Sequence, residues 1–157
     1  MSSNLSNSHS SEHTGSNAGT DRLFSATEKD KRGFTVLHLA VIKQRFPIVR
    51  WLTKQTFAAL LVRIADNNNN LALHYAALRG SKKMAQLLLK RNRDMLNLRN
   101  ISGATPLHVA AFEGHSVTFV QWLVEEVGAD ATAVMEVSVP TIVKLKVTFT
   151  TFNLLLF

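Results

Sequence analysis

Histidine is the residue of this chain whose spacing most invites a chemical interpretation. His38 and His74 lie 36 residues apart, and His108 follows 34 residues later. Imidazole is a common metal ligand, so a regular row of histidines would suggest a metal site. Units that pack like neighbouring helices place equivalent residues about 10 Å apart, whereas zinc holds each ligand at about 2 Å. The three histidines therefore cannot share one ion, and we assign them a structural role.

Other reaction chemistry finds little support. The chain has no cysteine, which excludes a disulfide framework, a thiolate zinc site and a cysteine nucleophile. It has no Gly-x-Ser-x-Gly elbow and no Gly-rich phosphate loop. Glu125 and Glu126 fit a solvated helix face better than an acid–base pair. His9 and His13 lie in a polar segment without a helical signal and fit solvated histidines. We therefore predict a protein that is not an enzyme, with no catalytic residue, cofactor or metal.

Charge divides the chain into two parts. The net charge is +7 over 157 residues. Residues 31–99 contain 14 Lys or Arg against only Asp66 and Asp94, a net charge of +12. Residues 100–136 contain no Lys or Arg and carry a net charge of −5. A strongly basic half is thus followed by an acidic end. At 46% hydrophobic and 18% charged residues, the composition excludes wholesale disorder.

Three segments repeat around the histidines. They read Thr35-Val36-Leu37-His38-Leu39-Ala40, then Leu71-Ala72-Leu73-His74-Tyr75-Ala76, then Thr105-Pro106-Leu107-His108-Val109-Ala110. These segments resemble the ankyrin repeat, which has a period of about 33 residues and the signature Thr-Pro-Leu-His-x-Ala. The third carries the full signature and continues with Gly114-His115, as the family does. The resemblance covers residues 27–130. It implies an all-α solenoid of stacked helix-turn-helix units, in which the histidines tie adjacent turns together.

The first helix of each unit has recognisable ends. Thr35 and Thr105 are suited to the N-cap position, because a hydroxyl can accept a hydrogen bond from a free backbone N–H. Pro106 then falls at the first helical position, where its missing N–H costs nothing. Gly80 and Gly114 tolerate the positive φ that ends a helix. These features predict short first helices that start and stop where the resemblance places them.

The second helix of each unit has an apolar face, which we expect to be buried. The faces are Ile48, Val49, Trp51 and Leu52; Met84, Leu87, Leu88 and Leu89; and Val117, Val120, Trp122, Leu123 and Val124. Trp51 and Trp122 are interpreted as equivalent residues of the core. Residues 30–33, 66–69 and 100–103 are rich in Asp, Asn and Gly, which favour turns between units.

Several residues depart from the pattern. Val36 stands where the family has Pro, and Gln44-Arg45 stand where it has Gly-His. Leu71-Ala72 replace Thr-Pro, so the first helix of the second unit lacks a good cap, at a cost of about 0.5–2 kcal/mol. The linkers 53–65 and 90–99 are longer than the family minimum. We therefore expect the middle unit to be less rigid than an ideal repeat.

The expected organisation has three parts. Residues 1–25 are Ser- and Asn-rich and predict a disordered tail without a secretory signal. Residues 26–136 form the ankyrin repeat domain, with repeats at about 30–65, 66–99 and 100–133. Residues 137–157 form an apolar tail with strand-like alternation over 143–150. Either this tail folds over the third repeat or the array is truncated, and we favour truncation. No stretch is long and apolar enough to span a membrane. The absence of cysteine and of a secretory signal predicts the cytoplasm or nucleus.

The resemblance implies a scaffold that binds a partner protein through turn tips and first helices on a concave face. The candidate partner-binding turn residues are Lys31, Arg32, Phe34, Asn68, Asn70, Ile101 and Ala104. On the first-helix side the candidates are Lys43, Arg45, Leu78, Arg79, Phe112 and Glu113. The basic charge of repeats one and two predicts that the partner is acidic where it meets them.

Two alternatives stay open. The basic half would also suit an electrostatic binder of nucleic acid or an anionic membrane surface. Nucleic acid is disfavoured because the aromatic residues fall on faces expected to be buried. Head-to-tail self-association, basic end against acidic end, is a further option. A narrower resemblance, on Phe112-Glu113-Gly114-His115 and residues 122–130, is to the ankyrin region of espin/forked-type actin-bundling proteins and implies a cytoskeletal adaptor.

Overall fold

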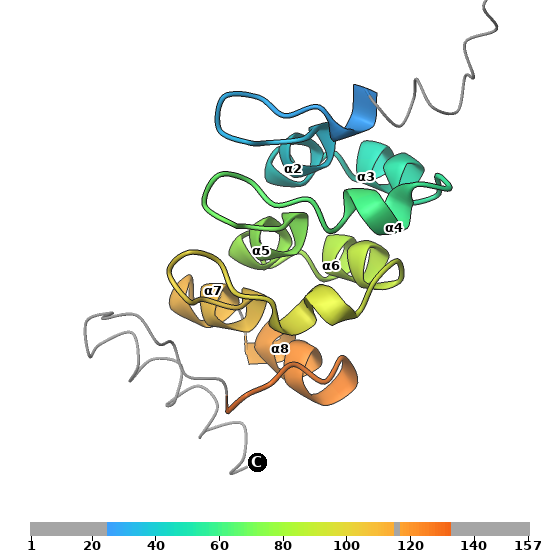
Figure 1. Cartoon of the computed structure of the whole chain (residues 1–157). Coiled ribbons are helices and arrows are strands. Elements are labelled where there is room, and N and C mark those ends of the chain that lie inside the picture. The colour runs from blue at the N-terminus through green and yellow to red at the C-terminus, as the bar shows by residue number, and fades with distance from the viewer. Residues whose placement is uncertain (1–24, 115–116, 133–157) are drawn as a thin grey trace, which may run out of the picture.

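The computed structural model describes residues 25–114 and 117–132 of the chain (Figure 1). The first repeat holds α2 (Val36–Ile42), α3 (Phe46–Leu52) and α4 (Ala58–Leu61). The second holds α5 (Ala72–Leu78), α6 (Lys82–Leu89) and the 3-10 helix η1 (Asp94–Asn97). The third holds α7 (Pro106–Phe112), α8 (Val117–Gln121) and the π-helical turn η2 (Trp122–Glu126). This confirms the predicted all-α stack of helix-turn-helix units.

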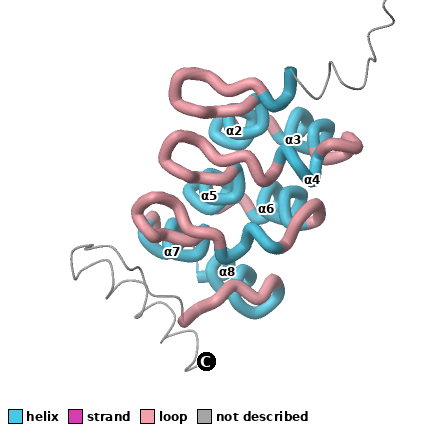
Figure 2. Tube along the Cα trace, viewed as in Figure 1, coloured by secondary structure: helices cyan, strands magenta, loops and turns pink. Residues whose placement is uncertain are grey.

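The units stack in register, so that each kind of element forms its own column. Figure 2 shows the inter-repeat turns along one side, the first helices α2, α5 and α7 beside them, and the second helices beyond. Helix α5 contacts both α2 and α7, and α6 contacts α3. Small residues make this close approach feasible: Ala40, Ala76 and Ala110 are buried at equivalent positions of the three first helices. The column order sets which side chains of each repeat can face outward.

The first helices begin as their sequences predict. Thr105 is the N-cap of α7, its hydroxyl oxygen accepts the backbone N–H of His108, and Pro106 takes the first helical position. Thr35 is the N-cap of α2. Leu71 takes the same position in α5 and has no hydroxyl, but its backbone N–H donates to Nδ1 of His74 at 3.1 Å. The His74 side chain therefore accepts the backbone N–H at the N-cap position even though the threonine is missing.

The ends of the first helices need positive φ, and one of them lacks glycine. Gly80 and Gly114 adopt φ of 60° and 70°, as predicted. Gln44, at the equivalent position of repeat one, is held at φ 56°. The next backbone N–H, from Arg45, donates to the carbonyl of Ala40 at 2.8 Å. The same hydrogen bond in repeat two joins Ser81 to Ala76 at 3.0 Å. The turn between α2 and α3 thus holds a glutamine in the conformation that glycine adopts in the other repeats, at a cost in free energy.

The core runs through all three repeats as one cluster. Leu37, Leu73 and Leu107, equivalent in the three first helices, are each no more than 2% exposed. The long linkers contribute to it as well, because α4 and η1 lie within them and bury Ala58, Leu61, Met95 and Leu96. The extra linker length is therefore structured and packed. Residues 1–24 of the predicted disordered tail and the whole predicted apolar tail 137–157, with its strand-like segment 143–150, lie outside the described residues.

Candidate functional site

Each inter-repeat turn is built around one acidic or amide side chain. Oδ1 of Asp30 accepts the backbone N–H groups two and four residues later, at 2.9 and 2.8 Å. Oδ1 of Asp66 does the same at 2.9 and 2.7 Å, and Oδ1 of Asn100 at 3.0 Å in both cases. This is the short-range bonding that makes Asp and Asn favourable in turns. The backbone of each turn tip is therefore fixed independently of the side chains it displays.

Neighbouring turns are also tied to one another. The backbone N–H and the side-chain amide of Asn67 donate to the carbonyls of Arg32 and Lys31, at 3.1 and 2.9 Å. The N–H of Ile101 donates to the carbonyl of Asn68 at 3.0 Å. The carbonyls of Lys31, Arg32 and Asn68 are thus occupied within the stack, while the side chains of these three residues are exposed. This combination suits a surface that recognises a partner through side chains.

The repeated histidines link successive repeats, as predicted. Nε2 of His38 lies 3.1 Å from the carbonyl oxygen of Asn70, and Nε2 of His74 lies 3.1 Å from that of Ala104. Because Nδ1 of His74 accepts the N–H of Leu71, its proton resides on Nε2, which donates to the next turn. All three histidines are buried. Among the described residues, no group of three or more His, Asp or Glu side chains is placed to hold a metal ion.

Burial keeps His38 and His74 neutral at pH 7. It lowers the pKa of His74 to about 4 and also lowers the pKa of His38, because an imidazolium would lose its hydration. The hydrogen bonds to the carbonyls of Ala104 and Asn70 oppose this effect but do not outweigh it. Neither group is therefore suited to exchange protons near neutral pH, which supports a structural role.

A second polar cluster joins the first two repeats. Burial raises the pKa of the Asp66 carboxyl, but hydrogen bonds from the Tyr75 hydroxyl and from Asn70 outweigh this and hold the pKa below its usual value. The Tyr75 ring meets the rings of Phe34 and His38 edge-on, with centroids 5.5 and 6.0 Å away. Tyr75 thus connects an aromatic contact with repeat one to the turn of repeat two, and this cluster is part of the framework.

The structure separates the predicted partner-binding residues into three groups. We call the exposed group the turn-side surface: Lys31, Arg32, Lys43, Arg45, Asn68, Arg79, Ile101, Phe112 and Glu113. Phe34, Asn70 and Leu78 are half-buried, and Ala104 is buried with its carbonyl bonded to His74. The guanidinium of Arg32 lies 5.6 Å from the centre of the Phe34 ring, which places a cation over an aromatic base at the first tip. Framework contacts thus occupy Phe34, Asn70 and Ala104.

Two expectations about the second helices are wrong. Trp51 and Ile48 are 54% and 44% exposed, so neither belongs to the core. Trp51 is equivalent to Leu87 and not to Trp122, because the repeats are offset by 36 residues here. Trp122 is 5% exposed and buried as expected. Val49 and Leu52 of the predicted apolar face of α3 point into the core, whereas Ile48 and Trp51 point away from repeat two. Ile48 and Trp51 are exposed because no unit precedes repeat one among the described residues. The offset of 36 residues between repeats one and two, which can be read from the sequence, already shows that Trp51 and Trp122 are not equivalent.

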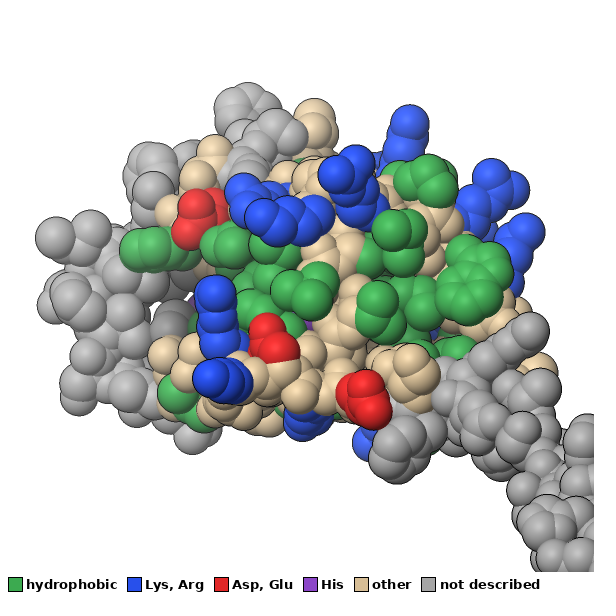
Figure 3. Space-filling model, turned by 90° about the horizontal axis from the view of Figure 1, so that it is seen from above, with side chains coloured by type: hydrophobic (Ala, Val, Ile, Leu, Met, Phe, Trp, Pro, Cys, Tyr) green, Lys and Arg blue, Asp and Glu red, His purple; other side chains and the backbone are tan. Residues whose placement is uncertain are grey.

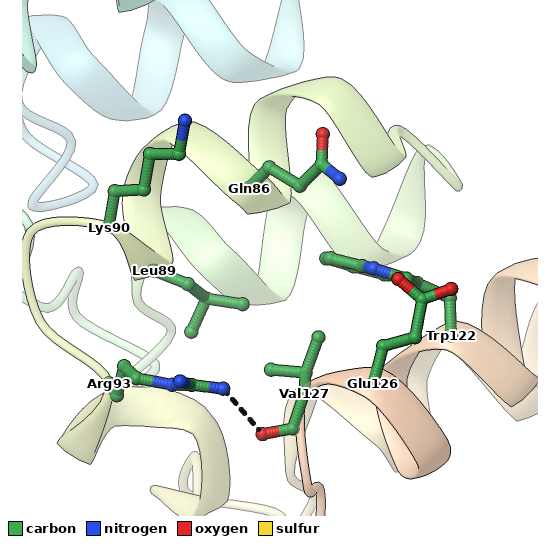
Figure 4. Close-up of a pocket in the computed structure, with 7 residues that line it drawn as sticks. All are labelled: Gln86, Leu89, Lys90, Arg93, Trp122, Glu126 and Val127. Atoms are coloured by element: carbon green, nitrogen blue, oxygen red, sulfur yellow. Dashed lines mark hydrogen bonds between the residues drawn. The ribbon is translucent and has the colours of Figure 1, made fainter.

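A shallow hollow lies between the second helices of repeats two and three (Figure 4). It has a volume of about 290 Å³. Arg93 crosses it and donates from Nη2 to the carbonyl of Val127 at 3.0 Å. The ammonium of Lys82 lies 5.2 Å from the ring centre of Trp122 and 3.5 Å from a carboxylate oxygen of Glu126. These cations are engaged in holding the two repeats together, and the hollow offers no convergent set of catalytic groups.

Comparison with known proteins agrees with this geometry. The family described as "Ankyrin repeats (3 copies)" matches residues 13–97 and 54–135. The chain is 39% identical over 99 residues to the probable 26S proteasome regulatory subunit p28 of Saccharomyces cerevisiae, which covers 63% of this chain and 42% of that protein.

Two relatives from Gallus gallus are also similar. The nuclear factor NF-kappa-B p105 subunit is 38% identical over 77 residues, which cover 48% of this chain and 8% of that protein. NF-kappa-B inhibitor alpha is 31% identical over 90 residues, which cover 57% of this chain and 28% of that protein. The chain thus spans less than half the length of each of these relatives. Within residues 25–114 and 117–132, no helix has the length and hydrophobicity that crossing a bilayer requires.

Proposed function

Because this chain belongs to the ankyrin repeat family, we propose that it holds a partner protein with its turn-side surface. Members of this family are protein-binding scaffolds and not enzymes, so the chain acts by stoichiometric recognition. The observation that carries the proposal is that backbone and side chains of the turns have different roles. Backbone groups are bonded within the stack, while Arg32, Asn68 and Ile101 display their side chains at successive levels.

Charge indicates the chemistry of the partner. Five of the nine turn-side residues are Lys or Arg and all five lie in the first two repeats, whereas Glu113 lies in the third. A partner acidic where it meets repeats one and two would match this pattern and associate faster at low salt. Such a surface also discriminates against basic proteins, since like charges would face each other.

The names of the relatives refine the setting. They describe a regulatory subunit of the proteasome and an inhibitor of NF-kappa-B, which supports a regulatory binding role in the cytoplasm or nucleus for this chain. The cytoskeletal role implied by the narrower resemblance gains no support from these names. We therefore propose a regulatory adaptor without assigning it to the cytoskeleton.

Capture of partners by the full chain tests this function. The bait is compared with a variant carrying Arg32→Ala, Arg79→Ala and Ile101→Ala, in which Phe34 is kept because its ring packs on the framework. A matched control carries Lys83→Ala and Arg91→Ala, which are exposed residues of the second-helix side. We expect specific proteins to be retained by the wild type and the control and lost by the turn-side variant.

The same experiment decides about the electrostatic alternative. Binding of nucleic acid or another polyanion falls by orders of magnitude between about 50 and 200 mM salt, because counterions are released. A protein contact with an apolar centre such as Ile101 weakens far less. If all three baits retain the same material and lose it over this salt range, the turn-side proposal is wrong and the basic half is a polyanion-binding surface.

A further inference from the structure

The outer end of repeat one carries an exposed apolar surface. Figure 3 looks down on this end and shows hydrophobic side chains gathered there, with Lys and Arg and some Asp or Glu side chains around them. The exposed fractions are 40% for Val36, 41% for Leu39, 44% for Ile48, 54% for Trp51 and 56% for Leu60. We call these five residues the repeat-one end face. Contiguous exposed apolar patches on proteins commonly mark interaction sites.

The equivalent positions in repeat two are packing positions. Moving 36 residues along the chain leads from the end face to Ala72, Tyr75, Met84, Leu87 and Leu96. Ala72, Met84 and Leu96 are 1%, 2% and 5% exposed, and Tyr75 and Leu87 are half-buried against the core. Tyr75 shows the reason, since its ring packs against Phe34 and His38 of the preceding repeat. The end face therefore presents the residues by which a repeat stacks on its predecessor.

The end face has the geometry of a helix-binding surface. Val36 and Leu39 are three residues apart on α2, and Ile48 and Trp51 are three apart on α3. Each pair forms a ridge along its helix, and the two helices contact each other. Ridges of this kind accept the side chains of another helix in the groove between them. The face is thus shaped for an amphipathic helix in the manner in which α5 and α6 receive α2 and α3 of the preceding repeat.

The charge around the end face selects the partner. Lys43, an exposed residue that also belongs to the turn-side surface, continues the stripe of Leu39 along α2. Arg50 and Lys54 are exposed as well, but they line the hollow between α3 and α6, on the side of α3 that faces repeat two. In the part of the chain that the structure describes, none of these three forms an ion pair. Repeat one has seven Lys or Arg against a single acid, Asp30. A second copy of the chain that docked through its own end face would bring like charges together.

We propose that the repeat-one end face binds an amphipathic helix of a partner protein whose apolar stripe is flanked by Asp or Glu. This site goes beyond the turn-side surface, because it lies on a different side of the array and uses apolar stacking positions. An anionic membrane would offer the same charge. The helix is favoured because neighbouring residues cover about half of each apolar side chain, and a ridged helix reaches such side chains better than a flat lipid surface does.

The test uses a fluorescein-labelled peptide of 18 residues with Leu along one helical face, Glu on both flanks and Ala elsewhere. Two control peptides replace every Glu by Lys or move the Leu residues off the common face. Fluorescence polarisation measures binding to the full chain. We expect the Glu peptide to bind at least ten times more tightly than either control peptide, because both the stripe and the flanking charge are needed.

Variants assign the binding to the end face. The double variant Leu39→Ala, Trp51→Ala is expected to bind the Glu peptide at least ten times more weakly, because truncation of a central Trp anchor commonly has an effect of this size. The matched control, Ile101→Ala with Phe112→Ala, removes two apolar side chains of the turn-side surface that are 64% and 50% exposed, and it is expected to change the affinity less than twofold. Thermal unfolding confirms that both variants are folded, and peptide binding is expected to shield wild-type Trp51 from iodide quenching.

Several results would overturn the proposal. They are equal binding of the Glu and Lys peptides, equal losses in the two variants, or peptide binding without protection of Trp51. Sedimentation of the chain with phosphatidylserine vesicles, lost on Trp51→Ala and not matched by peptide binding, would make the face a membrane contact. Dimerisation lost in the same variant would make the occupant a second copy. The outcome for the turn-side variant in partner capture is independent, so the two proposals can fail separately.

Discussion

Acid should destabilise the array through His74. Its Nδ1 accepts the N–H of Leu71, and its Nε2 donates to the carbonyl of Ala104. Protonation would put a proton on Nδ1, facing the N–H donor of Leu71, and would place a charge in a buried site. Its pKa is about 4 in the folded chain, against about 6.5 in an unfolded chain. The unfolded state therefore binds more protons between these two values, and the native state loses stability as the pH falls through them.

The size of the effect follows from linkage. Stability from this group is fully present above about pH 6.5 and is lost progressively down to about pH 4. Between pH 7 and pH 5, these two pKa values give a loss of about 2 kcal/mol for His74 alone. His38 adds to the loss in the same direction, because burial lowers its pKa too. Asp66 does not contribute in this interval, since its lowered pKa moves its titration to more acidic solution.

Urea unfolding at pH 7 and pH 5, followed by circular dichroism, measures the difference. With a slope of 1–3 kcal/mol per molar urea, the loss from His74 alone should lower the midpoint by about 0.7–2 M. The variant His74→Asn is less stable at both pH values but should lose at least 1 kcal/mol less between them. Titration of the imidazole by NMR gives the pKa directly. A wild type and a variant with the same pH dependence, or a native His74 pKa near 6.5, would refute the reasoning.

Three further predictions concern the backbone and one hydroxyl. Gly33→Ala should cost at least 2 kcal/mol more than Gly128→Ala in urea unfolding, because both have φ near 80° but a Cβ at Gly33 would lie 2.6 Å from a backbone nitrogen, whereas one at Gly128 meets nothing within 4 Å. Equal costs would contradict this close approach. Gln44→Gly should raise stability by about 1 kcal/mol, since its φ is 56°; an unchanged midpoint would show that the conformation is unstrained. Tyr75→Phe should cost about 1–3 kcal/mol by removing the donor to Asp66, and a neutral result would mean that water replaces it.

Sequence reasoning predicted the framework well, because its key residues are local signals. The Leu-His-x-Ala segments gave the register of the stack, Pro106 marked a helix start, and Gly80 marked a helix end. The positive φ of Gln44 could not be predicted, because nothing in a glutamine side chain favours it. The turn from α2 into α3, closed by the hydrogen bond from the N–H of Arg45 to the carbonyl of Ala40, holds that conformation. The short helices α4 and η1 were also missed, because their segments lack helical periodicity and gain order from buried residues such as Leu61 and Met95.

The candidate site was predicted less completely, since exposure depends on neighbours. Ala104 and Ile101 belong to the same turn, yet Ala104 is 7% exposed and Ile101 64%. Spacing alone places both at the tip. Trp51 illustrates the opposite error, because an apolar residue on an amphipathic helix is normally buried. Only the comparison with Leu87, which packs against repeat one, shows that the partner of Trp51 is not supplied by the described residues.

The histidine links have a consequence for how such a chain can change. His38 and His74 each bond to a backbone carbonyl in the following turn. A carbonyl is present whatever residue occupies the position, so the receiving turn can exchange its side chains without weakening the link. Substitutions at tips such as Asn68 and Ile101 can therefore alter specificity while leaving the stack intact. New binding preferences are then open to selection, or to laboratory grafting, without a matching repair of the scaffold.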